Sequence, residues 1–256
     1  MQSKIAPDRL FCWGLFLGGI MLKISNFSKT YSNGHVAIAN LNLTVEAGDI
    51  YAFIGSNGSG KTSTIKAIVG IHDFDGEIIV NGKKVNRKNE IYKKDIAYIP
   101  DNPDVYENLT GFQYANFVSD LYEVEKNIRE EKLEYFSNLF EMKSFLNNRI
   151  SSYSHGMKQK IVIISALIHS PKLLVMDEPF VGLDPKSSYL LKEEMRKLAR
   201  NGGAIFFSTH VLEVAEKLCN KIAMIDNGHL IVEGGTTEIL KNSDGLEQYF
   251  MEMIKK

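Results

Sequence analysis

Cysteine is scarce in this chain, and charge of one sign is not in excess. Cys12 and Cys219 are the only two cysteines among 256 residues. They form neither a disulfide framework nor the paired spacing of a metal site, so we expect a reducing compartment. The 30 basic residues are balanced by 31 acidic ones, which gives a formal net charge of −1. Because no global basic field recruits nucleic acid, we expect no nucleic-acid partner.

Long apolar runs are also missing. The stretch Leu10–Leu22 is uncharged and mostly apolar, but it is 13 residues long, and a membrane-spanning helix needs about 20. Lys4 and Arg9 before it are typical of a secretory signal, yet no small-residue cleavage site follows. We expect residues 1–20 to be a non-core extension, with Met21 as a candidate initiator. A membrane-surface anchor is the alternative.

A glycine-rich stretch carries the strongest signal. Residues 55–62 read GSNGSGKT and fit the phosphate-loop pattern Gly-x4-Gly-Lys-[Ser/Thr]. Residues 49–54 predict a buried strand, and residues 62–71 predict a helix. This arrangement directs backbone N–H groups and the positive end of a helix at one point, where a polyphosphate binds. A Gly/Ser-rich turn without function is the alternative. The predicted nucleotide contacts are Gly55, Ser56, Asn57, Gly58, Ser59, Gly60, Lys61, Thr62 and Thr64.

Two adjacent carboxylates follow a second predicted buried strand, residues 172–177. Asp177 and Glu178 stand at its carboxyl end, where open α/β sheets bind their ligands. We expect Asp177 and the Thr62 hydroxyl to hold Mg²⁺. Lys61 would then reach the β- and γ-phosphates, and Glu178 would orient or deprotonate the attacking water. An acidic strand-end loop without catalytic function is the alternative.

Two further polar segments are open to two interpretations each. His210 follows a predicted strand at residues 204–208 and could contact a γ-phosphate, although a strand-end histidine is more often structural. Ser154 opens a predicted helix, residues 154–169, where it fits the role of an N-cap. The functional interpretation of Ser154 is a second phosphate-binding helix terminus.

The order of the predicted elements indicates the fold class. Short strands at residues 22–31, 41–45 and 76–80 suggest an antiparallel sheet beside the phosphate loop. Apolar and aromatic residues recur at helical spacing from about residue 104 to 149, which predicts a helical subdomain. Strands and helices then alternate, and the tail from residue 236 is helical. We predict an α/β fold with a mainly parallel sheet, an antiparallel β flank and a helical subdomain inserted at about 104–160.

Together these motifs resemble the nucleotide-binding subunit of an ATP-binding cassette (ABC) transporter, a family with a P-loop NTPase core. The resemblance covers nearly everything from about Met21 to Leu240, with the motifs in the family's order, and implies one ABC ATPase domain over 21–256. It implies that Tyr31 stacks on adenine, and that Ser154 and Gly156 meet the γ-phosphate held by an opposite subunit. The matching segments are 55–62 (Walker A), 153–157 (signature), 173–178 (Walker B with its glutamate), 182–184 (D-loop) and His210 (switch histidine).

Two positions depart from the family pattern. Asp101 stands where the family usually has glutamine, after the predicted strand at 96–100. A carboxylate can still bind Mg²⁺ or its water, while it adds negative charge near the phosphates. His155 replaces the first of two glycines in the signature and adds bulk near a partner's nucleotide. The segments around these two residues look most similar to bacterial ABC-2-type exporter ATPases.

The resemblance implies an ATPase that drives a separate transmembrane permease, with export favoured and the docking region near Asp101 to Leu121. Glu178, His210 and Lys61 are the expected catalytic residues, and Thr62, Asp177 and Asp101 the expected Mg²⁺ ligands. One phosphate loop and one signature imply a homodimer, or a heterodimer with a similar ATPase. The expected location is cytoplasmic, on the inner face of the cell membrane. A cassette that acts on DNA or ribosomes is the alternative, and a P-loop kinase is a third interpretation.

Overall fold

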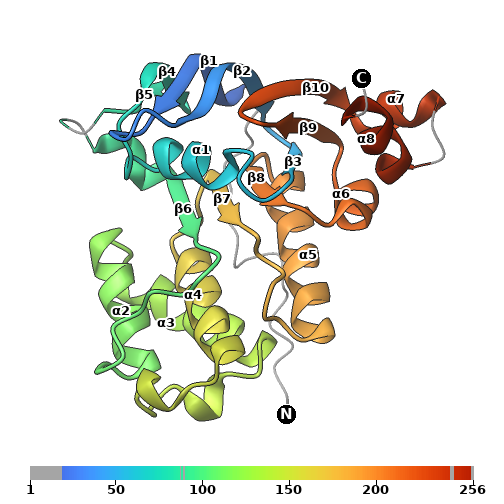
Figure 1. Ribbon diagram of the computed structural model, residues 1–256. Helices are drawn as coiled ribbons and strands as arrows, with labels where there is room; N and C mark the ends of the chain where they lie inside the picture. The colour runs from blue at the N-terminus through green and yellow to red at the C-terminus, as the bar shows by residue number, and fades with distance from the viewer. Residues whose placement is uncertain (1–18, 87, 89, 243–244, 255–256) are drawn as a thin grey trace.

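Two β-sheets and a group of helices below them make up the structure, a computed structural model (Figure 1). The structure describes residues 19–86, 88, 90–242 and 245–254. The expected extension at residues 1–20 lies outside the described residues, apart from Gly19 and Ile20. Ile20 is already the first residue of a strand, one position before the predicted domain start.

The central sheet has six strands, and five of them run parallel. Along the sheet these are β10 (His229–Gly235), β9 (Lys221–Asp226), β3 (Ile50–Gly55), β8 (Ala204–Thr209), β7 (Leu173–Asp177) and β6 (Ile96–Ile99). β10 pairs antiparallel with β9 through a turn at Asn227-Gly228. Every residue of β3, β7 and β8 is buried, as expected for parallel strands that are covered on both faces. Polar side chains from these strands can therefore meet solvent only at the strand ends.

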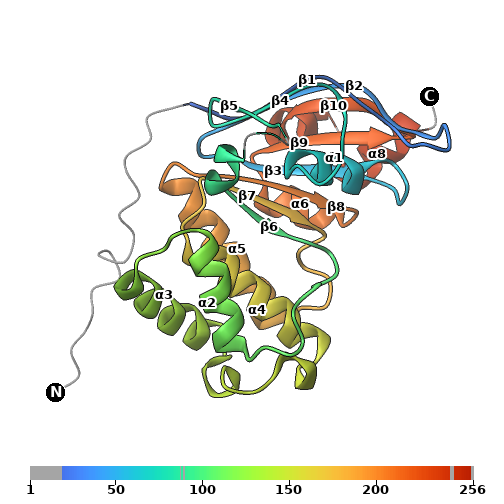
Figure 2. The ribbon, with the colours of Figure 1, turned by 90° about the vertical axis from the view of Figure 1, so that its left-hand side faces the viewer.

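A four-stranded sheet forms the predicted antiparallel flank. In spatial order it contains β2 (Val36–Glu46), β1 (Ile20–Thr30), β4 (Asp75–Val80) and β5 (Lys83–Lys84). β2 begins earlier than the predicted strand at 41–45, because the pairing with β1 extends to Val36 opposite Thr30. Figure 2 shows this sheet as the layer above the six-stranded sheet.

Side chains that alternate along the central strands supply two hydrophobic cores, one on each face. Tyr51 and Phe53 of β3 and Phe206 of β8 belong to the core shared with α1 (Lys61–Ile68) and the antiparallel sheet. Phe207, the next residue of β8, belongs to the core on the opposite face. Helix α1 is therefore buried between the two sheets, and this position fixes the phosphate loop that precedes it.

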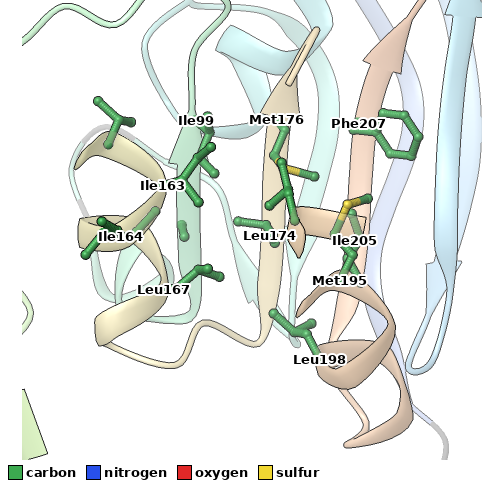
Figure 3. Packing of buried hydrophobic residues seen from close by; sticks show 14 of the residues in the cluster. Ile99, Ile163, Ile164, Leu167, Leu174, Met176, Met195, Leu198, Ile205 and Phe207 are labelled. Carbon is green, nitrogen blue, oxygen red and sulfur yellow. The ribbon is translucent and has the colours of Figure 1, made fainter. Parts of the chain in front are cut away.

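Helices cover the second face. α2 (Gly111–Leu121), α3 (Lys126–Leu139) and the start of α4 (His155–Ile168) form the predicted helical subdomain, which occupies the lower part of Figure 1. α4 continues beneath the sheet, where Ile163, Ile164 and Leu167 pack beside Ile99 and Leu174 (Figure 3). A capping box between Thr110 and Gln113 begins α2, and the predicted Ser154 cap begins α4.

The remaining helices complete this face. Met195 and Leu198 of α5 (Pro185–Arg200) lie beside β7 and β8 (Figure 3), and α6 (Leu212–Leu218) contacts α8 (Leu246–Ile254). α7 (Thr236–Ile239) precedes α8. The described residues also form the 3₁₀ turns η2 (Ile91–Asp95), η3 (Lys143–Phe145), η4 (Ile150–Ser152) and η5 (Leu240–Asn242). None of the helices in the described ranges combines the length and the apolar character needed to cross a membrane.

The predicted fold class is confirmed: the protein is α/β, with a mainly parallel sheet, an antiparallel flank and a helical subdomain. The predicted helix at 62–71 is shorter, because α1 ends at Ile68 and Gly70 adopts φ +77. The predicted helical tail is interrupted, with η5 between α7 and α8.

The two-sided core yields a stability prediction. Phe207 is fully buried, so Phe207→Ala should lower the free energy of unfolding by about 3–5 kcal/mol, because it removes apolar contacts and leaves a cavity. Phe112, which is 47% exposed, is the matched control, and Phe112→Ala should cost about 1 kcal/mol or less. Urea unfolding followed by circular dichroism measures both, and equal costs would contradict this account of the core.

Candidate functional site

A cavity of about 270 Å³ lies where the central strands β3, β6 and β7 end and α1 begins. Carboxyl ends of parallel strands are the usual ligand-binding edge of such a sheet. Predicted site residues from four separate segments meet here. The lining consists of Tyr31, His35, Ala37, Asn57, Gly58, Gly60, Lys61, Thr62, Ser63, Asp101, Asp177 and Glu178.

The phosphate loop depends on glycine at two places. Gly60 has φ +106, and a Cβ at this position would collide with the Ala37 carbonyl oxygen. A Cβ at Gly55 would collide with the Ser59 hydroxyl and would lie 2.5 Å from the Ile225 carbonyl oxygen. Larger residues would therefore push the loop away from β2 and β9. The loop keeps its backbone close to the sheet and its exposed turn, Ser56 to Gly58, open to solvent.

A buried cation forms the floor of the cavity. The Lys61 ammonium donates to the Gly55 carbonyl at 2.8 Å and to the Ser56 carbonyl at 3.1 Å. It also lies 3.8 Å from Glu178 Oε1, and Lys61 is only 6% exposed. Burial lowers the pKa of Lys61, and the negative charges of Glu178 and Asp177 oppose this effect. The ammonium is thus held at the loop, with carboxylates facing it across the cavity.

One hydroxyl organises the two Walker B carboxylates. Asp177 and Ser208 are register partners across β7 and β8. The Ser208 hydroxyl donates to Asp177 Oδ1 and accepts the backbone N–H of Glu178 at 3.0 Å. Glu178 has φ +45, a left-handed conformation that a non-glycine residue adopts at a cost. Ser208 therefore orients one carboxylate and stabilises the backbone turn that aims the other.

The residues around Asp177 fit a magnesium ion that arrives together with phosphate. Asp177 Oδ2 is buried and has no partner within hydrogen-bonding distance among the described residues. Burial raises the pKa of Asp177, while the Ser208 and Thr62 hydroxyls lower it. Oxygen ligands from Asp177, Thr62 and Asp101 suit Mg²⁺, which usually binds through few protein groups and keeps waters or phosphates. The described residues include no set of three or more His, Cys, Asp or Glu that could hold a metal alone.

His210 stands just beyond the end of β8 and contacts the second carboxylate. Its Nδ1 lies 2.9 Å from Glu178 Oε1, while the Glu178 side chain is 16% exposed and that of His210 52%. Glu178 therefore sits between two nitrogen-bearing side chains, Lys61 and His210. The structure brings all three predicted catalytic residues together.

Tyr31 forms one rim of the cavity, as the adenine assignment requires. Its hydroxyl lies 2.9 Å from the Ser63 hydroxyl, and its ring stacks on His35 with centroids 6.4 Å apart. The Lys29 ammonium lies 5.3 Å from the Tyr31 ring centroid. Ser63 and His35 were not predicted from the sequence. Ser63 directly follows Lys61 and Thr62 of the phosphate loop, and this adjacency could have predicted its position at the cavity.

The structure does not bring Thr64 to the cavity. Thr64 is fully buried, and its hydroxyl donates to the Gly60 carbonyl at 3.1 Å, one helical turn back. Two residues along a helix correspond to a rotation of about 200°, so Thr64 points away from the side that Thr62 presents. Ser63 takes the place predicted for Thr64. Gly55, Ser56 and Ser59 shape the loop but do not line the cavity.

Ser154 and Gly156 lie outside this cavity. Ser154 accepts the Met157 N–H at 3.3 Å, so it caps α4 as predicted. α4 belongs to the face of the six-stranded sheet opposite α1, as Figures 1 and 2 show. A single chain therefore separates its signature residues from its own phosphate loop.

Comparison with known proteins identifies the family. The sequence matches the ABC transporter family over residues 38–181, more than half of the chain. The chain belongs to this family. It is 32% identical to the ABC-type transporter ATP-binding protein EcsA of Bacillus subtilis, covering 92% of this chain and 97% of EcsA. It is 30% identical to the ABC transporter ATP-binding protein NatA of the same organism, covering 85% of this chain and 90% of NatA.

A solved structure described as the ATP-binding subunit of an ABC transporter has a TM-score of 0.87 and 30% identity, covering 91% of this chain and 99% of that one. An ATP-binding cassette in a dimeric post-hydrolysis state with ADP and Pi has a TM-score of 0.75 at 22% identity, which shows a shared fold. The predicted family and ABC ATPase fold are confirmed. This protein is an ATP-binding subunit of an ABC transporter, and ATP hydrolysis is its reaction.

Ser208 provides a test of the site geometry. Ser208→Ala removes the donor to Asp177 and the acceptor of the Glu178 N–H, so kcat for ATP hydrolysis should fall on the order of 10- to 100-fold. The control is Ser165→Ala, because Ser165 is equally buried but donates to a carbonyl within α4. Steady-state phosphate release measures both variants. Unchanged turnover in Ser208→Ala would remove Ser208 from its positioning role.

Proposed function

We propose that this chain supplies one half of a composite ATP site and uses ATP-driven association to power a separate transmembrane permease. The observation that carries the proposal is the separation of two residue sets within one chain. Lys61 and Glu178 line one cavity, and His210 contacts Glu178 beside it. Ser154 and Gly156 open α4 outside this cavity. Both sets can act on one nucleotide only if a second subunit supplies the signature.

Within the cavity each residue has a distinct role. Lys61 and the loop N–H groups bind the phosphates, since a buried cation and oriented amides stabilise negative charge strongly. Thr62 and Asp177, with Asp101 at the rim, would hold Mg²⁺, which neutralises charge on the phosphate oxygens. Glu178 would orient the attacking water and accept its proton, and His210 would contact the γ-phosphate. Tyr31 would stack on the adenine ring.

Phosphate entry requires a rearrangement of charges. Glu178 now contacts both Lys61 and His210, and a γ-phosphate would compete for the same two nitrogen groups. Binding of ATP would therefore release the Glu178 carboxylate toward water. The second subunit would then complete the site through Ser154 and Gly156 of its own α4, whether it is an identical copy or a similar ATPase. A dimeric relative of the same fold with ADP and Pi supports this arrangement.

The surface of the helical subdomain fits a membrane-protein partner. Tyr106, Phe117 and Leu121 are 61%, 40% and 64% exposed, and the rings of Tyr106 and Phe117 lie 5.5 Å apart. An exposed apolar group of this kind is typical of an interaction site. We propose that it is the docking surface for a permease on another chain, and that the protein acts at the cytoplasmic face of the membrane. Export rests on the resemblance of the segments around Asp101 and His155 to ABC-2-type exporter ATPases.

Glu178→Gln tests the hydrolytic step. The amide cannot accept a proton, so the hydrolysis rate should fall by about 10²- to 10⁴-fold while ATP still binds. An ATP-dependent dimer should accumulate, because the complex no longer turns over. Phosphate release and sedimentation velocity with ATP measure the two effects. Near-normal turnover would exclude Glu178 as the base, and a strictly monomeric protein with full activity would overturn the composite site.

Lys61→Ala tests the phosphate loop. Loss of the ammonium should weaken ATP binding by roughly 10- to 100-fold, the expected range for a charge-assisted hydrogen bond. Lys66→Ala is the control, since Lys66 lies on the same helix outside the cavity. Titration with a fluorescent ATP analogue measures both affinities. Equal affinities in the two variants would contradict the assignment of Lys61.

A further inference from the structure

The first turn of α4 lies directly against the loop that leads from Glu178 to α5. A Cβ on Gly182 would come within 2.6 Å of the His155 ring, and a Cβ on Gly156 would come within 2.9 Å of the Gly182 carbonyl oxygen. Gly182 also has φ +79, so glycine satisfies both its conformation and this close approach. The signature turn and the loop Glu178 to Asp184 are therefore in direct contact within one chain.

An ion pair also joins α4 to the end of this loop. The Lys160 ammonium lies 2.8 Å from Asp184 Oδ2, and the Lys160 side chain is only 15% exposed. The other carboxylate oxygen of Asp184 accepts the Ser187 N–H at 2.8 Å and caps α5. The hydrogen bond from Lys160 is the main reason that the pKa of Asp184 is lowered. One carboxylate thus joins α4, the loop and α5.

The residue before Lys160 contacts the other loop at the cavity. Gln159 is fully buried, and its Nε2 lies 3.5 Å from the Pro100 carbonyl oxygen. Pro100 directly precedes Asp101, which lines the cavity. Two consecutive residues of α4 therefore contact the two loops that carry Asp101 and Glu178. The same helix begins with Ser154 and Gly156.

We propose that Lys160 is a positioning residue that ties the Ser154–Gly156 turn to the loop carrying Glu178. The inference rests on the proposed composite site. It means that a movement of the loop at a chain's own nucleotide also moves the Ser154–Gly156 turn, which the chain presents to its partner's nucleotide. Without this ion pair, the loop would keep its contact with α4 at Gly182 and the packing of Phe180 on Phe207, but it would lose its ionic link to α4. The turn would then be less well placed for the partner, and a small displacement of positioned groups weakens their action strongly.

A simpler interpretation gives Lys160 no role beyond stabilising the start of α5. Asp184→Asn separates the two interpretations, because asparagine keeps a capping oxygen for the Ser187 N–H but loses the charge. If the Lys160–Asp184 ion pair positions the turn, Asp184→Asn and Lys160→Met should weaken ATP-dependent dimerisation equally, and the double variant should weaken it no further. Helix stabilisation alone predicts that neither Asp184→Asn nor Lys160→Met weakens ATP-dependent dimerisation.

The first measurement is dimer formation in the Glu178→Gln background with saturating ATP. Sedimentation equilibrium should give a dissociation constant roughly three- to tenfold larger when Lys160→Met is added, the range expected for one partly buried ion pair. Lys160→Arg should restore dimerisation. Lys158→Met is the matched control, because Lys158 lies on the same helix but pairs with Glu107 instead.

The second measurement is hydrogen exchange on the monomer without nucleotide. Lys160→Met should raise the exchange of amides in residues 180–184 severalfold, and Lys158→Met should not. ATP affinity of the monomer should stay unchanged in both, since neither lysine lines the cavity. A rise in exchange confined to this loop supports the tie, and unchanged exchange overturns it.

The outcomes separate this inference from the function on which it rests. If Glu178→Gln does not dimerise with ATP at all, the composite site is wrong and the inference is overturned with it. If Glu178→Gln dimerises and the addition of Lys160→Met makes no difference, only the role of Lys160 is overturned. Weaker dimerisation that Lys160→Arg restores and Asp184→Asn reproduces supports it.

Discussion

Burial of the parallel sheet on both faces is the constraint from which the site follows. Since β3, β7 and β8 are buried throughout, polar groups are tolerated in this region mainly where the strands end. Asp177 ends β7, Asp101 follows β6, and His210 follows β8. The phosphate loop leaves β3 at the same edge. Packing thus concentrates charge at one edge, where it can act on a ligand.

Charges gathered in this way need partners, and the structure supplies nearly all of them internally. Lys61 is satisfied by loop carbonyls, and Glu178 by Lys61 and His210. Ser208 satisfies one oxygen of Asp177, while the other remains buried and unpartnered among the described residues. This unpartnered oxygen, Asp177 Oδ2, is the feature that best fits a metal ion that binds together with phosphate. The site is therefore preorganised, and the proposed metal ion would supply the partner that Asp177 Oδ2 lacks.

The nucleotide cavity and the Ser154–Gly156 turn are separate in space, yet direct contacts link them. The cavity lies on the α1 side of the sheet, and α4 carries the signature from the other side. Gln159 and Lys160 bridge them through the loops that follow β6 and β7. The proposed composite site, in which one subunit acts on the nucleotide of another, depends on such a connection. The dense packing around α4 makes it a rigid element suited to that task.

The sequence alone determined the parts of this protein that depend on neighbours along the chain. The Gly55–Thr62 loop, the Asp177-Glu178 pair after an apolar strand, and the caps of α2 and α4 follow from local backbone geometry. Tertiary structure decided the contacts between distant segments. The pairing of β7 with β8 sets Asp177 opposite Ser208, and no local pattern fixes that register. Helical rotation and burial placed Ser63 rather than Thr64 at the cavity, and the packing of α4 on the Glu178–Asp184 loop brought Lys160 to Asp184, because such contacts depend on where whole elements lie.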